Sequence, residues 1–405
     1  MASPISQPRR RRVLIIVENL PVPFDKRVWN EATALVRAGY TVTVICPIGK
    51  GYESRREVRD GVTIYRHPLP LEADGAVGYA LEYGSALFWE LLLAIRVAMK
   101  EGFDVLQACN PPDTIFLIGG LFKLFGKRFV FDHHDINPEL YVAKFGRKDL
   151  AYRLIVALER WTFRTADISI ATNESYREIA VTRGGMRNDR VFVVRSGPDV
   201  SKVRPVPPVP SLKKGRAYLL GYVGVMGKQE GLNYLLDAMR HIVQVRGRRD
   251  IQCAVIGSGT ELENIKAYCA SLGLGEYVEF TGRVPDDTLM AYLSTADLCV
   301  NPDVANEMND KSTMNKIMEY MALGKPIVQF DLTEGRRSAL EASLYARGND
   351  AVDLAEKILD LLSDPARMAS MGEFGRHRVE NELAWKYSEV QFLKAYDAVF
   401  RSEAL

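Results

Sequence analysis

Short apolar runs alternate with amphipathic helical patterns along most of the chain. In the first half, runs rich in β-branched residues predict strands at 13–17, 41–46, 62–66, 104–107, 128–132, 167–171 and 191–194. Between the first two runs, the segment Val28–Ala38 places Ala32, Leu35 and Val36 on one side of a helix. Strands that alternate with helices are typical of βαβ units around a parallel sheet.

The alternation stops at residues 202–214, where the segment VRPVPPVPSLKK contains four prolines. Proline fixes φ and has no N–H donor, so this segment is stiff and continues neither a helix nor a sheet. The alternation then restarts, with predicted strands at 218–223, 252–256, 278–281, 297–300 and 327–330. The pattern therefore predicts an α/β protein with two Rossmann-like, doubly wound domains that face each other across a cleft.

We place an N-terminal domain at residues 1–200, with a basic tail at 1–12, and a C-terminal domain at 216–385. The proline-rich linker 201–215 joins them. The last helical stretch, Ser388–Arg401, carries an apolar and aromatic face that needs a surface to pack on. We expect the segment 386–405 to return to the first domain.

Composition excludes several classes of protein. Of the 405 residues, 47% are hydrophobic and 26% charged, and the net charge is +2, so no case arises for a nucleic-acid partner. The five cysteines are scattered without a CxxC pair, as in proteins of a reducing compartment. Arg9–Arg12 run directly into the strand at 13–17, and no apolar run is long enough to cross a bilayer. We therefore expect a cytoplasmic protein.

Two features of the sequence would suit a peripheral contact with the inner face of the cell membrane. Arg9–Arg12 would attract anionic lipid, although a solvated tail is the simpler interpretation. An apolar helical face is the second feature, although burial in the core is the simpler interpretation there. This face consists of Leu87, Phe88, Leu91, Leu92 and Ile95.

The segment KSTMNKIMEYMALGKPIVQFDLTEG, residues 311–335, carries the strongest candidate site. Ser312 and Thr313 precede a predicted helix, Met314 to Leu323, and a strand follows at once. The unpaired N–H groups and the dipole at such a helix start bind anions. Glu319 lies about two turns into the helix, within reach of a ribose attached to a bound diphosphate. The segment favours a nucleotide-sugar site; an ordinary capped amphipathic helix is the alternative.

A second candidate is FDHHD, residues 131–135, at the end of a predicted strand, where doubly wound sheets collect catalytic groups. His134 beside Asp135 suits a polar active-site role. A metal site is a rival interpretation, but adjacent residues on a strand point to opposite faces, so sequential ligands rarely converge. We therefore expect no metal here, and ordinary loop packing stays open.

Three glycine-containing turns follow predicted strands in the second half. The first, GYVGVMGKQEGL, combines glycines such as Gly224 with Lys228, which is placed to neutralise phosphate. The second turn contains Gly257, and the third contains Gly282 followed by Arg283. Glycine spacing alone is weak evidence, and ordinary tight turns explain the second and third equally well.

Taken together, these stretches resemble the retaining glycosyltransferases of family 4, which have the GT-B fold. They look especially like the bacterial enzymes that build exopolysaccharide, O-antigen or capsule chains. The ordered set of matches is specific, whereas each piece alone is not. The matching residues are 24–47, 131–141, 171–180, 193–199, 221–232, 255–263, 278–302 and 312–328.

The resemblance implies sugar transfer from a nucleotide diphosphate sugar, a UDP-sugar, to a glycan or lipid-linked glycan acceptor bound by the first domain. It implies neither a metal nor any other cofactor. Glu319 would hold the ribose, Lys228 the phosphates, and His134 would lie near the donor sugar. The other candidate donor-binding residues are Gly224, Gly257, Gly282, Arg283, Val284, Ser312, Thr313, Met314 and Lys316.

The chain departs from the family pattern at a position eight residues before Glu319. An acid is usual there, but this chain has Lys311, with Asp310 beside it. We expect Asp310 to replace that acid through a one-residue shift in the loop before the helix, and so to join His134, Asp135 and Lys228 as a catalytic residue. Two alternatives follow: a nucleotide-sugar epimerase of the same fold, or a non-catalytic nucleotide-sugar-binding protein.

Overall fold

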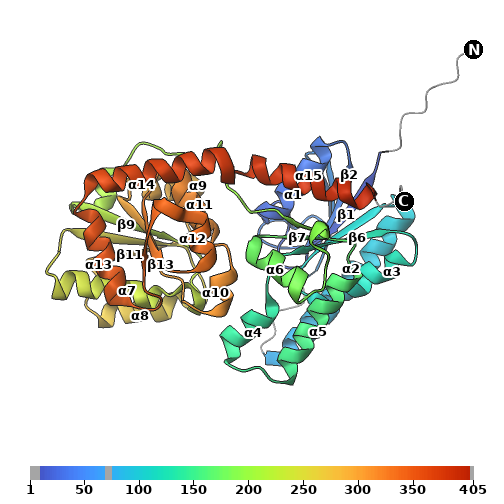
Figure 1. The fold of residues 1–405 in the computed structure, drawn as a ribbon, viewed down its shortest axis with the longest axis horizontal. Helices are drawn as coiled ribbons and strands as arrows, with labels where there is room; N and C mark the ends of the chain where they lie inside the picture. The colour runs from blue at the N-terminus through green and yellow to red at the C-terminus, as the bar shows by residue number, and fades with distance from the viewer. Residues whose placement is uncertain (1–9, 69–74, 402–405) are drawn as a thin grey trace, which may run out of the picture. The chain divides into compact units, whose positions relative to one another are not determined.

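The computed structural model describes residues 10–68 and 75–401, and side chains in all of these except 75–83 (Figure 1). The chain forms two compact units. Unit 1 comprises Met1–Val194 and Glu389–Leu405, and unit 2 comprises Arg195–Ser388. The proline-rich segment 201–215 therefore belongs to unit 2, and the chain passes from one unit to the other shortly before it.

Unit 1 is built on an eight-stranded sheet with the order β3-β4-β2-β1-β5-β6-β7-β8. Every pairing is parallel except that of β3 with β4. The strands are β1 (Arg12–Ile16), β2 (Thr41–Pro47), β3 (Arg56–Arg59), β4 (Val62–His67), β5 (Val105–Cys109), β6 (Arg128–His133), β7 (Ile168–Ala171) and β8 (Val191–Val193). All seven strands expected in this half are present, and the pattern missed β3, whose sequence REVR is mostly exposed.

The helices of unit 1 cover both faces of this sheet (Figure 1). They are α1 (Lys26–Arg37), α2 (Gly75–Lys100), α3 (Phe116–Lys123), α4 (Asn137–Phe145), α5 (Leu150–Thr165), α6 (Glu174–Thr182) and most of α15 (Trp385–Arg401). From Glu389 onward, α15 packs in unit 1, where the hydroxyl of Tyr396 donates a 2.6 Å hydrogen bond to Gln107 on β5. The guanidinium of Arg11 stacks 3.8 Å from the ring centre of Phe400. Part of the predicted basic tail is thus incorporated in the fold.

Unit 2 is built on a six-stranded, fully parallel sheet with the order β11-β10-β9-β12-β13-β14. The strands are β9 (Tyr218–Val223), β10 (Ile251–Ile256), β11 (Val278–Gly282), β12 (Leu298–Asn301), β13 (Ile327–Phe330) and β14 (Ser343–Ala346). The pattern missed the edge strand β14. The helices are α7 (Leu232–Arg240), α8 (Leu262–Ser271), α9 (Asp286–Thr295), α10 (Glu307–Lys311), α11 (Asn315–Ala322), α12 (Thr333–Ala339), α13 (Ala351–Leu362) and α14 (Pro365–Arg378).

Both sheets reverse their winding direction at one point. In unit 1 the chain returns to place β5 beside β1, and in unit 2 it returns to place β12 beside β9. Loops that leave the carboxyl ends of strands diverge at such a point, and ligands of doubly wound sheets bind there. In unit 1, the candidates His134 and Asp135 follow β6, the neighbour of β5. In unit 2, the candidates lie at the ends of β9, β10 and β11 and after β12. No helix in the described part of the chain has the length and apolar character needed to cross a membrane.

Candidate active-site residues

Three glycine turns meet at the carboxyl edge of the sheet in unit 2. The N–H of Gly224 donates to the carbonyl of Ile256 at 3.1 Å, and the N–H of Gly257 donates to the carbonyl of Gly282 at 3.0 Å. A Cβ on Gly257 would lie 2.0 Å from the carbonyl oxygen of Gly224, and φ at Gly257 is +130°. Only glycine fits this position, because both the contact and the backbone angle exclude a side chain. The structure thus brings together turns that the sequence placed separately.

The helix α11 begins at this same edge without a side-chain cap. Its N-cap residue is Met314, whose side chain makes no capping hydrogen bond, and the hydroxyl of Ser312 donates instead to the carbonyl of Met308 at 2.7 Å. The helix starts one residue later than expected. The N-cap side chain thus leaves the first N–H groups of α11 uncapped, and N–H groups at a helix start can donate to an anion. Glu319 lies half-buried in the second turn of α11.

Lys228 is exposed in the turn after β9, and its ammonium has no hydrogen-bond or ion-pair partner among the described residues. The turn itself is firmly held. The carbonyl of Gln229 accepts from the N–H of Val304 at 3.0 Å and from the side-chain amide of Asn309 at 2.9 Å. A Cβ on Gly231 would lie 2.0 Å from the carbonyl oxygen of Pro302. The exposed ammonium of Lys228 therefore extends from a turn whose backbone is held in place.

Lys316 occupies a different environment from the donor-binding position that we expected. Its ammonium is 2.6 Å from Glu230 and 3.0 Å from Asp303, and its side chain is only 10% exposed. Burial raises the pKa of Asp303 to about 7 despite the opposing charge of Lys316. The hydroxyl of Tyr222 donates to Glu230 at 2.9 Å. Lys316 therefore ties α11 to the turn of Lys228 and to the loop after β12.

Asp310 does not lie in an irregular loop, so the premise of the one-residue shift was wrong. It belongs to the short helix α10, and its two carboxylate oxygens accept from the N–H and hydroxyl of Thr333, at 2.8 and 3.0 Å. The carboxylate of Asp310 thus caps the N-terminus of α12. Lys311 forms a 2.8 Å ion pair with Glu307 one turn earlier. Of the remaining candidates in unit 2, Arg283 is exposed, and Val284 packs against the core.

In unit 1, His134 follows β6 and contacts two charged groups. Its Nε2 lies 2.7 Å from Oδ2 of Asp132 and 2.9 Å from Nε of Arg27. Although burial opposes ionisation, Arg27 and His134 hold the pKa of Asp132 well below its usual range. The Nε–H of Arg27 donates to Nε2 of His134, and the carboxylate of Asp132 lies against the same nitrogen, so Nε2 is fully occupied by these two charged partners. The half-buried ring then has Nδ1 as its second polar atom, with no partner among the described residues.

Asp132 is one of several buried polar groups from distant parts of the chain. Arg27 on α1 donates to Asp132 at 2.9 Å and to the carbonyl of Val194 at 2.7 Å. Glu31, one turn further along α1, accepts from the side-chain amide of Gln107 at 2.7 Å. Burial, followed by the nearby charge of Asp132, raises the pKa of Glu31 well above its usual range. The pKa values of these two neighbouring carboxyls are thus shifted in opposite directions.

Asn110 fixes the backbone around His134. Its side-chain oxygen accepts from the N–H groups of His134 and Asp135, at 2.7 and 3.1 Å. Its side-chain nitrogen donates to the carbonyl of Asp135 at 2.6 Å and to Asp113 at 2.9 Å. Burial raises the pKa of Asp135, whose carboxylate is half-buried. Sequence reasoning missed Asn110, Asp132 and Arg27 as positioning residues. For Asp132, a signal was available, because the alternation of side chains along β6 places Asp132 and His134 on one face.

The two adjacent histidines point to opposite faces of the strand, as the alternation predicts. His133 is buried among aromatic rings, with Phe163 at 5.1 Å and Tyr176 at 5.0 Å between ring centres. Ligand atoms of Cys109, Asp132 and His134 lie within 4.8 Å of one another. Burial raises the pKa of the Cys109 thiol, and Arg27 already supplies a cation at Asp132. A divalent ion there would face a protonated thiol and a neighbouring positive charge, so the donor set does not suit one.

Two family models match the chain over most of its length. The model described as Glycosyltransferase Family 4 matches residues 25–202, and the model described as Glycosyl transferases group 1 matches residues 217–364. The chain belongs to the family 4, group 1 glycosyltransferases. The sequence-based prediction of this family is confirmed. The boundary between the two matches falls in the proline-rich segment.

Relatives of this glycosyltransferase are distant in sequence. The 2-deoxystreptamine glucosyltransferase of Streptomyces kanamyceticus is 24% identical over 359 residues, which are 84% of this chain and 89% of the relative. Sucrose-phosphate synthase from Thermosynechococcus elongatus has a TM-score of 0.77 at 19% identity and covers 97% of this chain and 100% of its own. HepE from Anabaena, in complex with UDP and glucose, has a TM-score of 0.71 at 15% identity and covers 96% and 100%. The GT-B fold is confirmed by these neighbours.

Proposed function

We propose that this glycosyltransferase transfers a sugar from a UDP-sugar to a glycan or lipid-linked glycan acceptor in surface polysaccharide synthesis. We further propose that transfer retains the anomeric configuration and needs no metal. The observation that carries the donor assignment is the convergence of glycine turns, Lys228, the uncapped start of α11 and Glu319 at one sheet edge. HepE, which has the same fold, binds UDP, and this supports the choice of nucleotide.

The reaction requires stabilisation of the departing diphosphate. The bond between the anomeric carbon and the diphosphate oxygen breaks, and its electron pair leaves on that oxygen. The acceptor hydroxyl forms the new bond on the same face, and its proton passes to the departing phosphate. Lys228 and the first N–H groups of α11 are placed to stabilise the negative charge, which is usually the largest catalytic contribution. No protein nucleophile is required by this sequence of events.

His134 and Glu319 have recognition roles in this proposal. Glu319 offers a carboxylate that accepts from the two ribose hydroxyls. Nε2 of His134 is engaged by Arg27 and Asp132, so Nδ1 is the ring atom presented to a sugar hydroxyl. Asn110 and Arg27 orient the ring without contacting the donor. The proposal thus separates recognition of nucleotide and sugar from stabilisation of the leaving group.

A thermal-shift series tests the donor assignment directly. UDP and UDP-sugars are expected to raise the melting temperature, because ligand binding stabilises the native state by mass action. GDP and ADP are expected to shift it less. The variant Glu319→Gln is expected to weaken UDP binding about tenfold, since a charged acceptor for two hydroxyls becomes neutral. Glu307→Gln is the matched control, because Glu307 is an exposed residue of α10 that pairs with Lys311.

Turnover assays separate the alternatives. Transfer is expected to survive a chelator, and loss of turnover in EDTA that Mg²⁺ restores would contradict the metal-independent mechanism. Interconversion of the donor without any acceptor would identify an epimerase. Binding of UDP without turnover of any UDP-sugar would identify a nucleotide-sugar-binding protein. If GDP raised the melting temperature and UDP did not, the donor nucleotide would be GDP and not UDP.

A further inference from the structure

The long helix α2 exposes an apolar stripe on the surface of unit 1. Its members recur every three or four residues, so they share one face of the helix. They are Phe88, Leu92, Ile95 and Met99, whose exposed fractions are 56%, 42%, 36% and 77%. The opposite face is buried and consists of Ala86, Glu90, Ala94 and Val97. We expected the apolar face Leu87, Phe88, Leu91, Leu92 and Ile95 to belong to the core. Leu87 and Leu91 are half-buried, but the other three are exposed, because Ala86, Glu90, Ala94 and Val97 occupy the buried side.

The helices α3 and α5 continue this surface. Leu124 and Phe125, directly after α3, are 82% and 69% exposed. Phe122 on α3 contacts Phe103, just after α2, at 4.9 Å between ring centres, and Phe116 on α3 contacts Trp161 on α5 at 5.7 Å. α3 packs on α5, and the Phe103–Phe122 contact brings the end of α2 next to α3 (Figure 1). We call their exposed side the α2-α3-α5 face.

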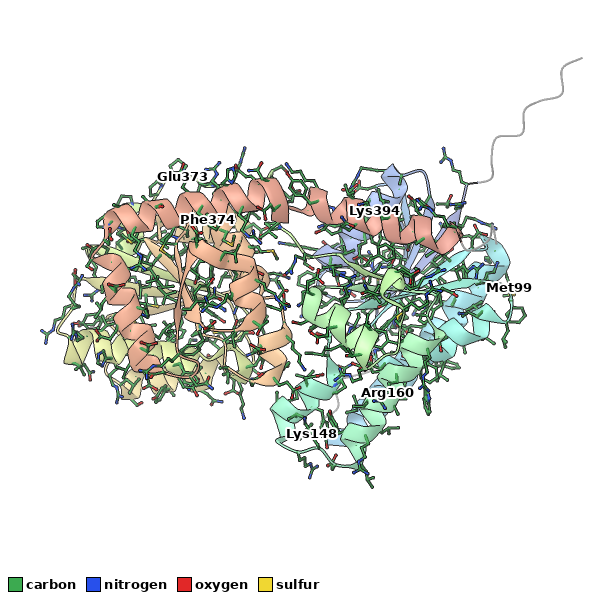
Figure 2. The ribbon with its side chains drawn as sticks, in the orientation of Figure 1. Met99, Lys148, Arg160, Glu373, Phe374 and Lys394 are labelled. Carbon is green, nitrogen blue, oxygen red and sulfur yellow. The ribbon has the colours of Figure 1, made fainter. Side chains whose placement is uncertain are left out.

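The α5 part of this face mixes large apolar groups with arginines. Leu150, Leu154 and Trp161 are exposed on the same side of the helix as the arginines. The exposed cations of α2 and α5 are Arg96, Lys100, Arg153, Arg160 and Arg164. Figure 2 shows Met99, Arg160 and Lys148 at the outer edge of unit 1 in this view. The positive charges therefore surround and interrupt the apolar area.

The described side chains on the exposed side of these helices include no carboxylate. Among the described side chains of α2, α3 and α5, the acids are Glu90 and Glu159, and both are fully buried. Glu159 pairs inward with Arg183, Nε to Oε2 at 2.5 Å. Every exposed charge among the described side chains of the three helices, which in α2 begin at residue 84, is thus positive, although the whole chain has a net charge of only +2. This local excess indicates a negatively charged partner.

We propose that the α2-α3-α5 face docks unit 1 on an anionic lipid bilayer. Apolar side chains such as Leu124 and Phe125 would enter the boundary between headgroups and acyl chains, and the arginines would extend to the phosphates. Contiguous apolar surface of this kind is uncommon on a soluble monomer. A second copy of the chain fits less well, because a symmetric contact would bring the same cations together. The proposal does not depend on the sugar-transfer assignment.

Vesicle flotation tests the electrostatic part. The full chain is expected to bind phosphatidylcholine vesicles that contain phosphatidylglycerol, to bind pure phosphatidylcholine weakly, and to lose affinity as salt rises. The triple variant Arg153→Gln, Arg160→Gln, Arg164→Gln is expected to lower the partition coefficient at least about tenfold, since each basic residue near an anionic surface contributes about fivefold. The charge-matched control replaces Arg240, Arg246 and Arg249 with Gln, because these are exposed arginines of unit 2.

A second pair of variants tests the apolar part. Replacing Leu124 and Phe125 with Ser is expected to lower binding at least about fivefold, because buried apolar area is lost. The control replaces Val245 and Val352, which are 68% and 51% exposed in unit 2, with Ser. Quenching of tryptophan emission by brominated lipid is a measurement on the unmodified chain. It is expected for the native protein and absent from the Trp89→Phe, Trp161→Phe variant.

Three results would overturn the proposal. Equal binding to neutral and anionic vesicles would remove the role of the cations. Equal losses in the α5 triple variant and its unit 2 control would show that the effect reflects net charge. A dimer in sedimentation that the Leu124→Ser, Phe125→Ser variant dissociates would show that a second copy covers the face. Nucleotide-induced thermal shifts in the same variants would report the donor site separately, so failure of either proposal is distinguishable.

Discussion

The carboxyl edges of the two sheets use the same topology for two kinds of chemistry. In unit 2, the edge consists of glycine turns, the start of α11 and an exposed lysine, so backbone groups dominate. In unit 1, the edge holds buried side chains, with Arg27, Asp132 and His134 in direct contact. A diphosphate needs several N–H donors in a small space, which a backbone supplies without conformational cost. Orienting one imidazole requires a particular set of charged partners.

The comparison predicts different responses to mutation. The edge in unit 1 should behave as one cooperative network, because removal of one partner leaves a buried charge uncompensated. In unit 2, replacement of the exposed lysine at the edge should lower activity but leave the stability of the protein unchanged. The following experiments test that contrast, from the largest expected effect to the smallest.

Asp132→Asn is expected to have the largest effect. It removes the charge that opposes buried Arg27, so we expect a stability loss of about 3–5 kcal/mol and a fall in turnover of at least about 100-fold as His134 loses its orientation. Urea unfolding and saturating-donor kinetics measure the two effects. Glu31→Gln is the matched comparison, because burial raises the pKa of Glu31 whereas Arg27 and His134 lower that of Asp132. Equal losses in both variants would contradict the assignment of charge to Asp132.

Lys316→Met tests the buried cluster behind the donor edge. Asp303 has a folded-state pKa of about 7 against an ordinary value of 3.8, so the native state binds the proton more strongly, and stability falls as pH rises through this window. Without Lys316, this pKa rises further. We therefore expect a loss of about 3–5 kcal/mol near pH 8.5 and a smaller loss near pH 5.5. Thermal unfolding at both pH values is the measurement, and a pH-independent loss would exclude this explanation.

Lys228→Ala is expected to lower kcat/KM about 100-fold, since a cation on the leaving phosphate is lost, while the melting temperature without ligand stays unchanged. The absence of a protein partner for Lys228 is the reason for unchanged stability. Lys266→Ala, an exposed lysine on α8, is the control. A lower melting temperature with normal kinetics would place Lys228 among the structural residues.

Asp310→Ala is expected to have the smallest effect. Loss of its contact with Thr333 should cost about 1 kcal/mol of stability, as for other helix caps, and lower transfer only a few-fold. Thr333→Val, which removes the hydroxyl but keeps the N–H, should cost less. A large loss of transfer with unchanged UDP binding and unchanged melting would restore the direct role at the donor sugar that the sequence favoured.

Much of the donor edge was predictable because its signals are local. Strand and helix periods located every strand except β3 and β14, two short edge strands with few alternating apolar positions. Gly224 and Gly257 follow strands β9 and β10, and Gly282 ends β11, at an edge where backbone approach to a phosphate needs glycine. Glu319 follows from its place in a helix that begins at such an edge. These inferences require only neighbours in sequence.

Only the tertiary structure decided which side chains share a buried environment. Tyr396 and Gln107 are 289 residues apart and are joined by a hydrogen bond, and no periodicity predicts such a pair. Lys316 looked like a donor-binding lysine, but Glu230 and Asp303 surround its ammonium in the folded unit. The apolar stripe of α2 looked like core, but Ala86 and Ala94 occupy the buried side. Local patterns determine which elements form and what backbone they present, whereas burial and charge pairing depend on which elements pack together.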